Sequence, residues 1–396
     1  LQMDNIAKVK GLSFRTQYGI RANFNESKRY TPVWYVASNQ NNTNSSLTMS
    51  RNNFTSWLWN GYLMYNRVIG KHSINSTLGA EIQDFRYSTL SGTAADVPEN
   101  PNLWYIDNSL TQSSKTSSNS MPTISRMASY FGRINYTFAS KYLLTVTGRY
   151  DGTSKFADSQ KWGFFPSFSA GWNIANEEFF QKFGEKTKIN TLKLRASWGQ
   201  LGNTNTNDAW YPFYQTMPTG SNYGWLVNGV RPNYSYNPGM VSLLKTWETI
   251  ETWDIGLDWG AFNNRLTGSF DYFVRHTKDM IGPAPELSSA LGTTVPKINN
   301  CDMKSYGFEL EIGWRDQIGG VKYGIKALLS DDQQKITRYP NESMNVSQYY
   351  KGRMLGDIWG LTTIGIAQSQ EEMDAHLAKV DQSTLGSNWG AGDIMY

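Results

Sequence analysis

Acidic side chains are the first candidates for chemistry in this 396-residue sequence, because paired carboxylates can hydrolyse glycosidic bonds. Some of them lie in segments where polar and apolar residues alternate, and there they share the polar face with Arg149, Lys193, Arg195 and Arg265. Such a mixture is typical of a wall that faces water or a polar partner. Ion pairing therefore explains these acids better than hydrolysis. The acids are Asp151, Glu248, Glu251, Asp254, Asp258, Asp271, Glu309 and Glu311.

Other catalytic patterns are missing from the sequence. The histidines are His72, His276 and His376, and none has a metal-ligand spacing to another His, Cys or acid. Cys301 is the single cysteine, so an internal disulfide is excluded. No Gly-rich phosphate loop, nucleophile elbow or catalytic triad spacing occurs. We expect no enzyme activity, no cofactor and no metal.

The segment 201–246 is the strongest candidate for ligand contact. It places aromatic residues among Asn, Gly and Pro, and flat rings bind the apolar faces of sugars or peptides while amides supply hydrogen bonds. The alternative is that the rings pack this loop against neighbouring loops or against a partner protein. The candidate residues are Trp210, Tyr211, Tyr214, Tyr223, Trp225, Tyr234 and Tyr236.

The composition favours β-structure. Aromatic residues make up 14% of the chain, and runs of helix-forming residues are scarce. No apolar run reaches roughly 18 residues, so no transmembrane helix is expected. This test does not detect the strands of a membrane barrel, because only every second residue of such a strand faces lipid. The net charge of +4 is too small and too dispersed to predict nucleic-acid binding.

Alternation with a period of two predicts long strands. Leu12 to Phe24 shows it first, with Phe14, Tyr18 and Ile20 on one face and Arg15 and Arg21 on the other. The pattern recurs at 141–151, 162–174, 192–198, 253–259, 266–274 and 306–314. About eleven strands result, and a strand of about twelve residues at ~3.3 Å each, tilted by roughly 40°, rises about 30 Å, enough to cross an outer membrane.

Connections between these strands alternate in length. Short links fall near Gly70, at 139–141, at 263–264 and at 317–320, and a longer one spans 176–188 with a short helix at 176–183 capped by Asn176. Long segments are expected at 26–52, 88–127, 201–246, 278–303 and from 338 onward, with a shorter loop at 152–161. This predicts short periplasmic turns and long external loops.

Aromatic residues bracket the short links, as membrane girdles do. The alternative is ordinary core packing, which would concentrate aromatic residues in the middle of strands. They are Tyr65, Phe138, Tyr142, Trp172, Trp259, Phe262, Trp314 and Tyr323.

Residues 132–172 resemble the SusC/RagA-like family of TonB-dependent importers, through the turn Arg149-Tyr150-Asp151-Gly152 and the strand entry Trp162-Gly163-Phe164-Phe165-Pro166. Similar stretches follow in the family's order at 189–203, 247–280 and 304–314. The resemblance implies an all-β fold, a transmembrane antiparallel β-barrel of about 22 strands in the bacterial outer membrane, of which residues 1–396 supply about half.

The resemblance also implies parts and partners outside this sequence. A plug domain and a TonB-contacting segment would precede Leu1, and further strands would follow Tyr396. The expected partners are a SusD-like surface lipoprotein, the TonB-ExbB-ExbD complex, outer-membrane lipid, and an oligosaccharide or peptide substrate. A passive pore and a soluble, secreted carbohydrate-binding β protein are the alternatives.

Overall fold

The computed structural model describes residues 1–396 except residues 1, 120–121, 205–209, 222–225 and 236. The chain divides into two compact units, residues 1–352 and 353–396. Each unit is described by itself.

The first unit is built on one antiparallel sheet, which has 13 strands among the described residues. Its strands follow one another in chain order from β1 to β17, and β7 pairs with β6 at the side of this path. The order is linear, so the sheet has two edges. Eleven strands are long, as the alternation predicts: β2 (Leu12–Thr31), β5 (Ser46–Ile69), β6 (His72–Ala95), β8 (Thr123–Phe138), β9 (Tyr142–Thr153), β10 (Trp162–Asn173), β11 (Ile189–Asn203), β14 (Glu248–Ala261), β15 (Leu266–Ile281), β16 (Asn299–Ile318) and β17 (Val321–Arg338). The short ones are β1 (Gln2–Asp4) and β7 (Thr116–Asn119).

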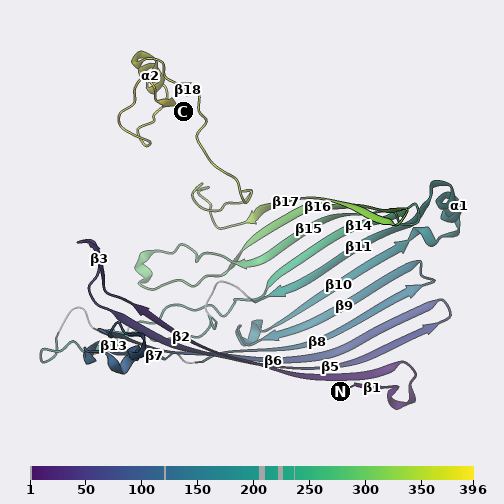
Figure 1. Cartoon of the computed structure of the whole chain (residues 1–396), viewed down its shortest axis with the longest axis horizontal. Helices are drawn as coiled ribbons and strands as arrows, with labels where there is room; N and C mark the ends of the chain where they lie inside the picture. The colour runs from purple at the N-terminus through teal and green to yellow at the C-terminus, as the bar shows by residue number, and fades with distance from the viewer. Residues whose placement is uncertain (1, 120–121, 205–209, 222–225, 236) are drawn as a thin grey trace. The chain divides into compact units, whose positions relative to one another are not determined.

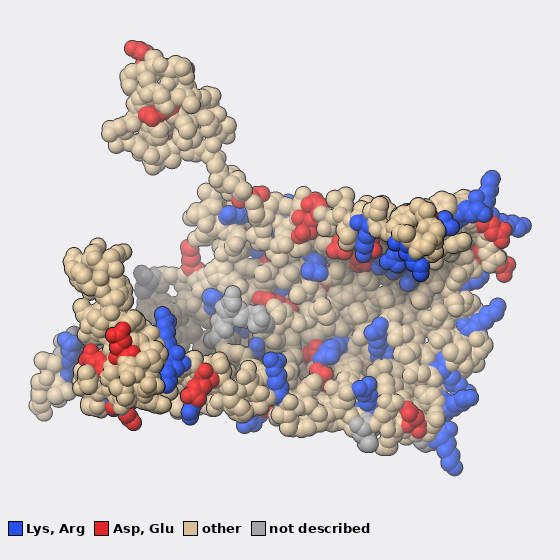
Figure 2. Space-filling view, in the orientation of Figure 1, with Lys and Arg blue, Asp and Glu red and all other residues tan. Residues whose placement is uncertain are grey.

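Short turns gather at one end of the sheet, which we call the short-turn rim (Figure 1). They need left-handed backbone: φ is 59° at Gly70, 55° at Ser140, 57° at Asn263 and 59° at Gly319. Glycine and asparagine adopt this conformation most easily. On the face drawn in Figure 2, lysine and arginine side chains project from this end.

The opposite end, the long-loop rim, differs from the expectation in one respect: the strands run further. Residues 26–31 and 46–52 were expected in a loop, yet they continue the β2–β5 ladder, as in the pair Thr31↔Ser46. Ser88 to Ala95 likewise extend β6, and 278–281 and 299–303 extend β15 and β16. Polar residues can continue a strand beyond its membrane-spanning part, because the pairing between strands depends on backbone hydrogen bonds.

What remains at the long-loop rim is short irregular structure. It comprises the pairs β3 (Trp34–Ala37) with β4 (Gln40–Asn42) and β12 (Thr219–Ser221) with β13 (Asn233–Ser235), and the 3-10 turns η2 (Pro101–Leu103), η3 (Ile106–Asn108), η4 (Gln112–Ser114), η5 (Asp158–Gln160) and η7 (Ser289–Leu291). One further turn, η1 (Ile6–Lys8), lies between β1 and β2.

The helix at the short-turn rim starts later than predicted. α1 spans Glu178–Thr187, and its N-cap position is Glu177, with no side-chain cap hydrogen bond. Asn176 ends the 3-10 turn η6 (Ile174–Asn176), and its amide donates to the Ser140 carbonyl at 2.8 Å. The Asn176 side chain is used to hold the neighbouring turn, so the predicted cap is wrong.

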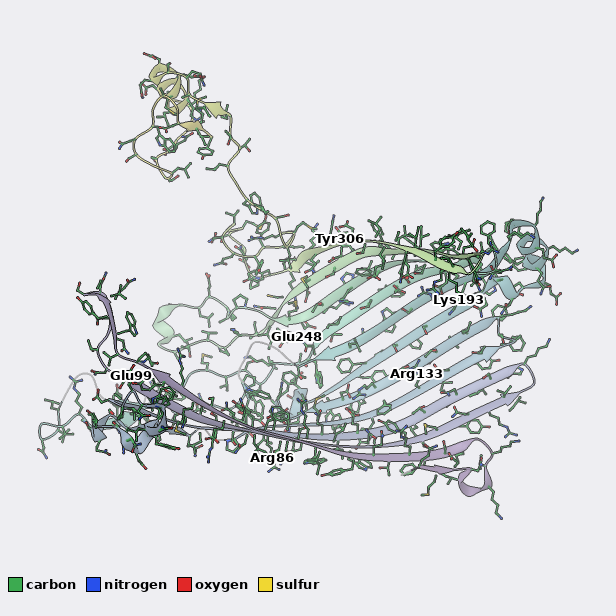
Figure 3. All side chains as sticks on the ribbon, in the orientation of Figure 1. Arg86, Glu99, Arg133, Lys193, Glu248 and Tyr306 are labelled. Atoms are coloured by element: carbon green, nitrogen blue, oxygen red, sulfur yellow. The ribbon has the colours of Figure 1, made fainter. Side chains whose placement is uncertain are left out.

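The register gives the sheet two unlike faces, because directly paired residues share a face. Leu63, Leu78, Gly132 and Gly148 are successive partners on the outward, apolar face. The aromatic residues predicted to bracket the short turns fall on this same face where they lie in strands, as Phe138 and its partner Tyr142 do. Figure 3 draws side chains leaving both faces of the sheet.

The second unit has its own small core of Ala367, Met373 and Met395, against which Leu377 and Trp389 pack. It contains β18 (Gly365–Ile366), α2 (Gln370–Leu377) and β19 (Ile394–Met395). The Ser369 side chain caps α2 by accepting from the Glu372 amide at 3.3 Å. Within the described part of the chain, no helix is both long and apolar enough to cross a membrane.

Candidate functional site

The inner face of the sheet is lined by paired charges. Arg149 on β9 donates from Nε to Asp151 Oδ1 at 2.7 Å and from Nη2 to Ser129 Oγ at 2.9 Å, and its guanidinium lies 5.3 Å from the Phe131 ring centroid. Five of the eight acids that could have suggested hydrolysis form ion pairs with Lys or Arg, namely Asp151, Glu251, Asp258, Asp271 and Glu311. The ion pairs therefore build a polar wall, as the sequence indicates.

Four of the seven predicted loop aromatics lie among the described residues, and the structure gives them different roles. The Trp210 ring stacks on Phe85 of β6 at 5.5 Å, and Lys155 Nζ lies 4.5 Å from the centroid of the Trp210 ring. The register places Phe85 on the inner face, because its partner Ser56 shares a face with Tyr62 and Arg15. Trp210 thus fastens the loop to the inner face of the wall.

Tyr211 and Tyr214 form a compact group with Phe213, whose ring centroid is 4.5 Å from that of Tyr214. Tyr211 meets both rings edge-on, at 6.2 and 5.9 Å. Tyr214 is 65% exposed, so its ring is open to a ligand. Tyr234 belongs to β13, where it is paired with Gly220. Tyr223, Trp225 and Tyr236 lie outside the described residues.

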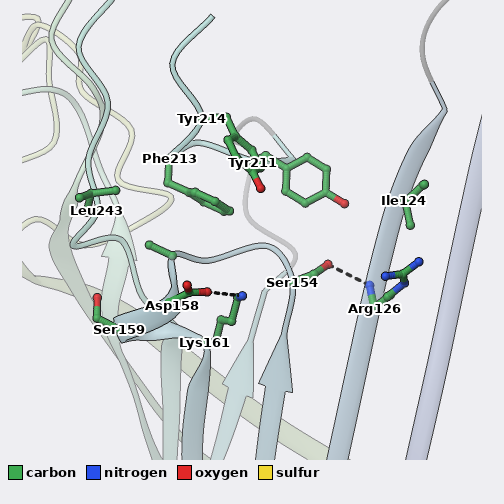
Figure 4. A pocket seen from close by; sticks show the side chains of 11 residues that line it. Ile124, Arg126, Ser154, Asp158, Ser159, Lys161, Tyr211, Phe213, Tyr214 and Leu243 are labelled. Carbon is green, nitrogen blue, oxygen red and sulfur yellow. Dashed lines mark hydrogen bonds and ion pairs between the residues drawn. The ribbon is translucent and has the colours of Figure 1, made fainter.

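The aromatic group borders a recess of about 730 Å³ at the long-loop rim (Figure 4). Residues of β8 and of the β9–β10 connection complete its lining: Ile124, Arg126, Ser154, Ala157, Asp158, Ser159 and Lys161, with Leu243 from the loop. Asp158 and Lys161 form an ion pair, and the hydrogen bond from Lys161 holds the pKa of Asp158 below its ordinary value. The recess combines flat rings with charged groups, which suits recognition of a polar, ring-containing ligand.

A buried aromatic cluster holds the floor of this rim in place. Trp247 is 5% exposed, meets Phe165 and Phe156 at 5.3 and 5.9 Å, and donates its indole N–H to the Lys161 carbonyl at 3.1 Å. Edge-to-face aromatic contacts of this kind add about 0.5–1.5 kcal/mol beyond area burial. The end of the 201–246 segment is therefore anchored to β10.

Sequence reasoning missed two members of the site. Phe213 was absent from the candidate set although it packs on Tyr214, and Lys155 was not considered although its Nζ donates to the Thr204 carbonyl at 3.2 Å. Burial lowers the pKa of Lys155. Phe213 lies within the run Trp210 to Tyr214 and could have been included, whereas the position of Lys155 depends on how the loop folds back.

No group of His, Cys, Asp and Glu in the described ranges is arranged to hold a metal ion. Cys301 is buried.

The long antiparallel strands, the apolar outward face and the charged inner face together define the wall of an outer-membrane β-barrel. The family model described as TonB dependent receptor-like, beta-barrel matches residues 5–381. The chain belongs to this family of TonB-dependent receptors, which are outer-membrane transporters and receptors rather than enzymes. The predicted family, fold class and location are confirmed.

This chain matches only part of the length of its curated relatives. The TonB-dependent receptor SusC of Bacteroides thetaiotaomicron is 30% identical over 264 residues, 64% of this chain and 24% of SusC. A TonB-dependent receptor of Formosa agariphila is 29% identical over 304 residues, 76% of this chain and 29% of that protein. The chain thus spans less than a third of either relative's length.

The same fold occurs in a solved structure of the RagAB peptide transporter. It superposes with a TM-score of 0.69 at 20% identity and covers 84% of this chain and 36% of that one.

Proposed function

We propose that the full-length protein actively imports a nutrient across the outer membrane. Energy reaches it from the TonB-ExbB-ExbD complex through a segment outside this sequence, and a SusD-like lipoprotein covers the long-loop rim. Residues 1–396 supply part of the barrel, while a plug domain and further strands complete the transporter. The family match over residues 5–381 is the observation on which this proposal rests.

The open edges of the sheet support the proposal that additional strands close the barrel. The edge strands β1 and β17 are not paired with each other in the described sheet, and each unpaired backbone group in lipid costs several kcal/mol. We therefore propose that the working barrel contains strands beyond those described here.

The substrate we propose is an oligosaccharide, with a peptide as the second candidate. Tyr214 is exposed beside Phe213, and such rings offer flat apolar faces to a sugar. The peptide candidate is favoured by the fold likeness to RagAB, whose structure is that of a peptide transporter.

The test is uptake by whole cells that carry the full-length protein, offered labelled oligosaccharides and labelled peptides separately. We expect one class to accumulate, and accumulation to stop when the gene for the TonB protein is deleted or the proton-motive force is collapsed. A transport-dead SusC-type transporter in the same strain controls for other routes.

Uptake that continues without TonB would identify a passive pore and overturn the proposal. A full-length protein that stays folded and monomeric in buffer without detergent would point instead to a soluble carbohydrate-binding protein.

A further inference from the structure

An apolar groove of about 600 Å³ lies on the outward face of the sheet. Its floor is the pair Gly132 on β8 and Gly148 on β9, which are direct partners. If Gly132 carried a Cβ, the nearest side-chain atom would be Leu78 Cδ1, at 3.8 Å. A Cβ at Gly148 would lie 3.3 Å from Phe164 Cε2. Two adjacent residues without side chains therefore leave a dent in the wall.

The walls of this groove are apolar and exposed. Leu78, Ile134 and Phe164 are 63%, 53% and 61% exposed, and the register places all three on the outward face. That face meets lipid in an outer-membrane barrel, so an acyl chain is the occupant that the surroundings supply.

An aromatic stack borders the groove on the side of the long-loop rim. Trp162 on β10 stacks with Tyr150 at 4.8 Å and with Tyr130 at 6.2 Å. From Phe138 to Ala128, β8 advances ten residues, which at ~3.3 Å each and a tilt of roughly 40° is a rise of about 25 Å, the height of the apolar band. Tyr130 therefore lies near the outer edge of this band, where aromatic rings are favoured.

A pair of arginines lies just beyond the stack on the same face. Arg126 and Arg86 each donate from Nε to one oxygen of Asp84, both at 2.9 Å. The Asp84 side chain is 4% exposed, whereas those of Arg126 and Arg86 are 64% and 53% exposed. Two guanidinium groups against one carboxylate leave a net positive charge that a phosphate can neutralise.

The geometry points to a binding site for a phosphorylated acyl lipid of the outer leaflet. Arg86 and Arg126 hold the phosphate, the Tyr130–Trp162–Tyr150 stack contacts the sugar or glycerol part, and an acyl chain lies in the groove over Gly132 and Gly148. Along the sheet, the arginine pair is followed by the aromatic stack and then by the groove. The phosphate, the sugar or glycerol part and the acyl chain of a lipid follow one another in the same order. The site depends on the outer-membrane location and not on transport.

Shared ligand chemistry makes free phosphate the main competing explanation for the arginine pair. Arg126 also borders the recess at the long-loop rim, so an anion could approach from there. Only a lipid, however, would need both the arginines and the groove.

The test uses the full-length protein in detergent and measures its affinity for diphosphorylated lipid A, for the same lipid without phosphates, and for inorganic phosphate. The charge variant combines Asp84→Asn, Arg86→Gln and Arg126→Gln, so that no buried carboxylate is left unpaired. The groove variant is Gly132→Val, which fills the dent. Lys193→Gln, on the inner face of β11 and outside the groove lining, and Ala327→Val, outward on β17, are the matched controls.

We expect the wild type and both controls to bind lipid A alike, and the charge and groove variants to bind it about tenfold or more weakly. Removing the phosphates from the lipid should weaken its binding to the wild type, whereas the affinity of the charge variant should be the same for both forms of the lipid. Equal binding by all proteins, or inorganic phosphate competing as well as lipid A, would overturn the lipid site. Folding is checked by heat-dependent gel mobility, and if the charge variant does not fold, Gly132→Val and the dephosphorylated lipid decide.

Discussion

Arg195 on β11 grips Asp258 on β14 with two hydrogen bonds, Nε to Oδ2 at 2.9 Å and Nη2 to Oδ1 at 2.8 Å. The same Nη2 also lies 3.0 Å from Asp271 Oδ1 on β15. One guanidinium therefore joins three neighbouring strands on the inner face. Two-pronged contacts of this kind are the strongest pairings that arginine makes with carboxylates.

Replacing Arg195 by Met should destabilise the full-length barrel by about 1.5–3 kcal/mol, because the charge-assisted bonds are lost and two carboxylates then face each other. The check is the temperature at which the purified protein loses its compact gel mobility. Lys193→Met is the control, since Lys193 lies on the same strand and face. Equal loss in both variants would contradict a special role for Arg195.

Acid should weaken the short-turn rim through Glu177. Hydrogen bonds from Tyr142, Lys141 and Trp172 lower the pKa of Glu177 from 4.5 to about 2. A lowered folded pKa means that the stabilisation is complete above the unfolded value of about 4.5 and is lost as the pH falls toward about 2. Unfolding midpoints measured across this window should fall with pH in the wild type and fall less in Glu177→Gln. Identical pH profiles would refute the assignment.

The sequence predicts the long strands well because a lipid-facing wall imposes strict alternation of polar and apolar residues. It does not predict where the strands end at the long-loop rim, since pairing there depends on the backbone and not on hydropathy. Residues 26–31 show this, as polar residues that continue β2. The inner-face partners of Arg195 were also not predictable as pairs, because they depend on the register between strands.

At the candidate site, the sequence indicates which aromatic residues are candidates, but it does not show which of them anchor the loop and which are exposed to a ligand. Trp210 contacts Phe85, a residue 125 positions earlier in the chain, and only the fold brings them together. The predicted substrate contacts themselves stay a prediction.

Two variants separate the roles of Trp210 and Tyr214. Trp210→Ala should release the loop after β11, so that limited proteolysis cleaves it several-fold faster, because both the Phe85 stack and the Lys155 contact are lost. Tyr214→Ala should leave proteolysis unchanged and weaken ligand binding by roughly 1–2 kcal/mol. Trp210→Phe is the control that keeps the stack. Equal proteolysis of the Trp210→Ala variant and the wild type would show that Trp210 is no anchor.

Two glycines in similar turns should respond differently to substitution. Gly11 has φ 88°, and a Cβ there would lie 2.1 Å from the Asn66 carbonyl oxygen, whereas Gly70 has φ 59° and open space around it. Gly11→Ala should therefore abolish or greatly reduce the folded yield, while Gly70→Asn, which tolerates left-handed backbone, should fold normally. The measurement is the folded fraction in isolated outer membranes. A normal yield for Gly11→Ala would contradict the close approach of these two backbones.

The most direct test of the wall is cysteine scanning along β9 in the full-length protein in cells, with Cys301 replaced by Ala. Cysteines at Leu144, Val146 and Tyr150 should react with a lipid-soluble maleimide and resist a charged, water-soluble one. Cysteines at Thr145, Thr147 and Arg149 should resist the lipid-soluble reagent, because they face inward. A strict alternation is the predicted result, and equal labelling of neighbouring positions by both reagents would contradict a membrane-spanning strand.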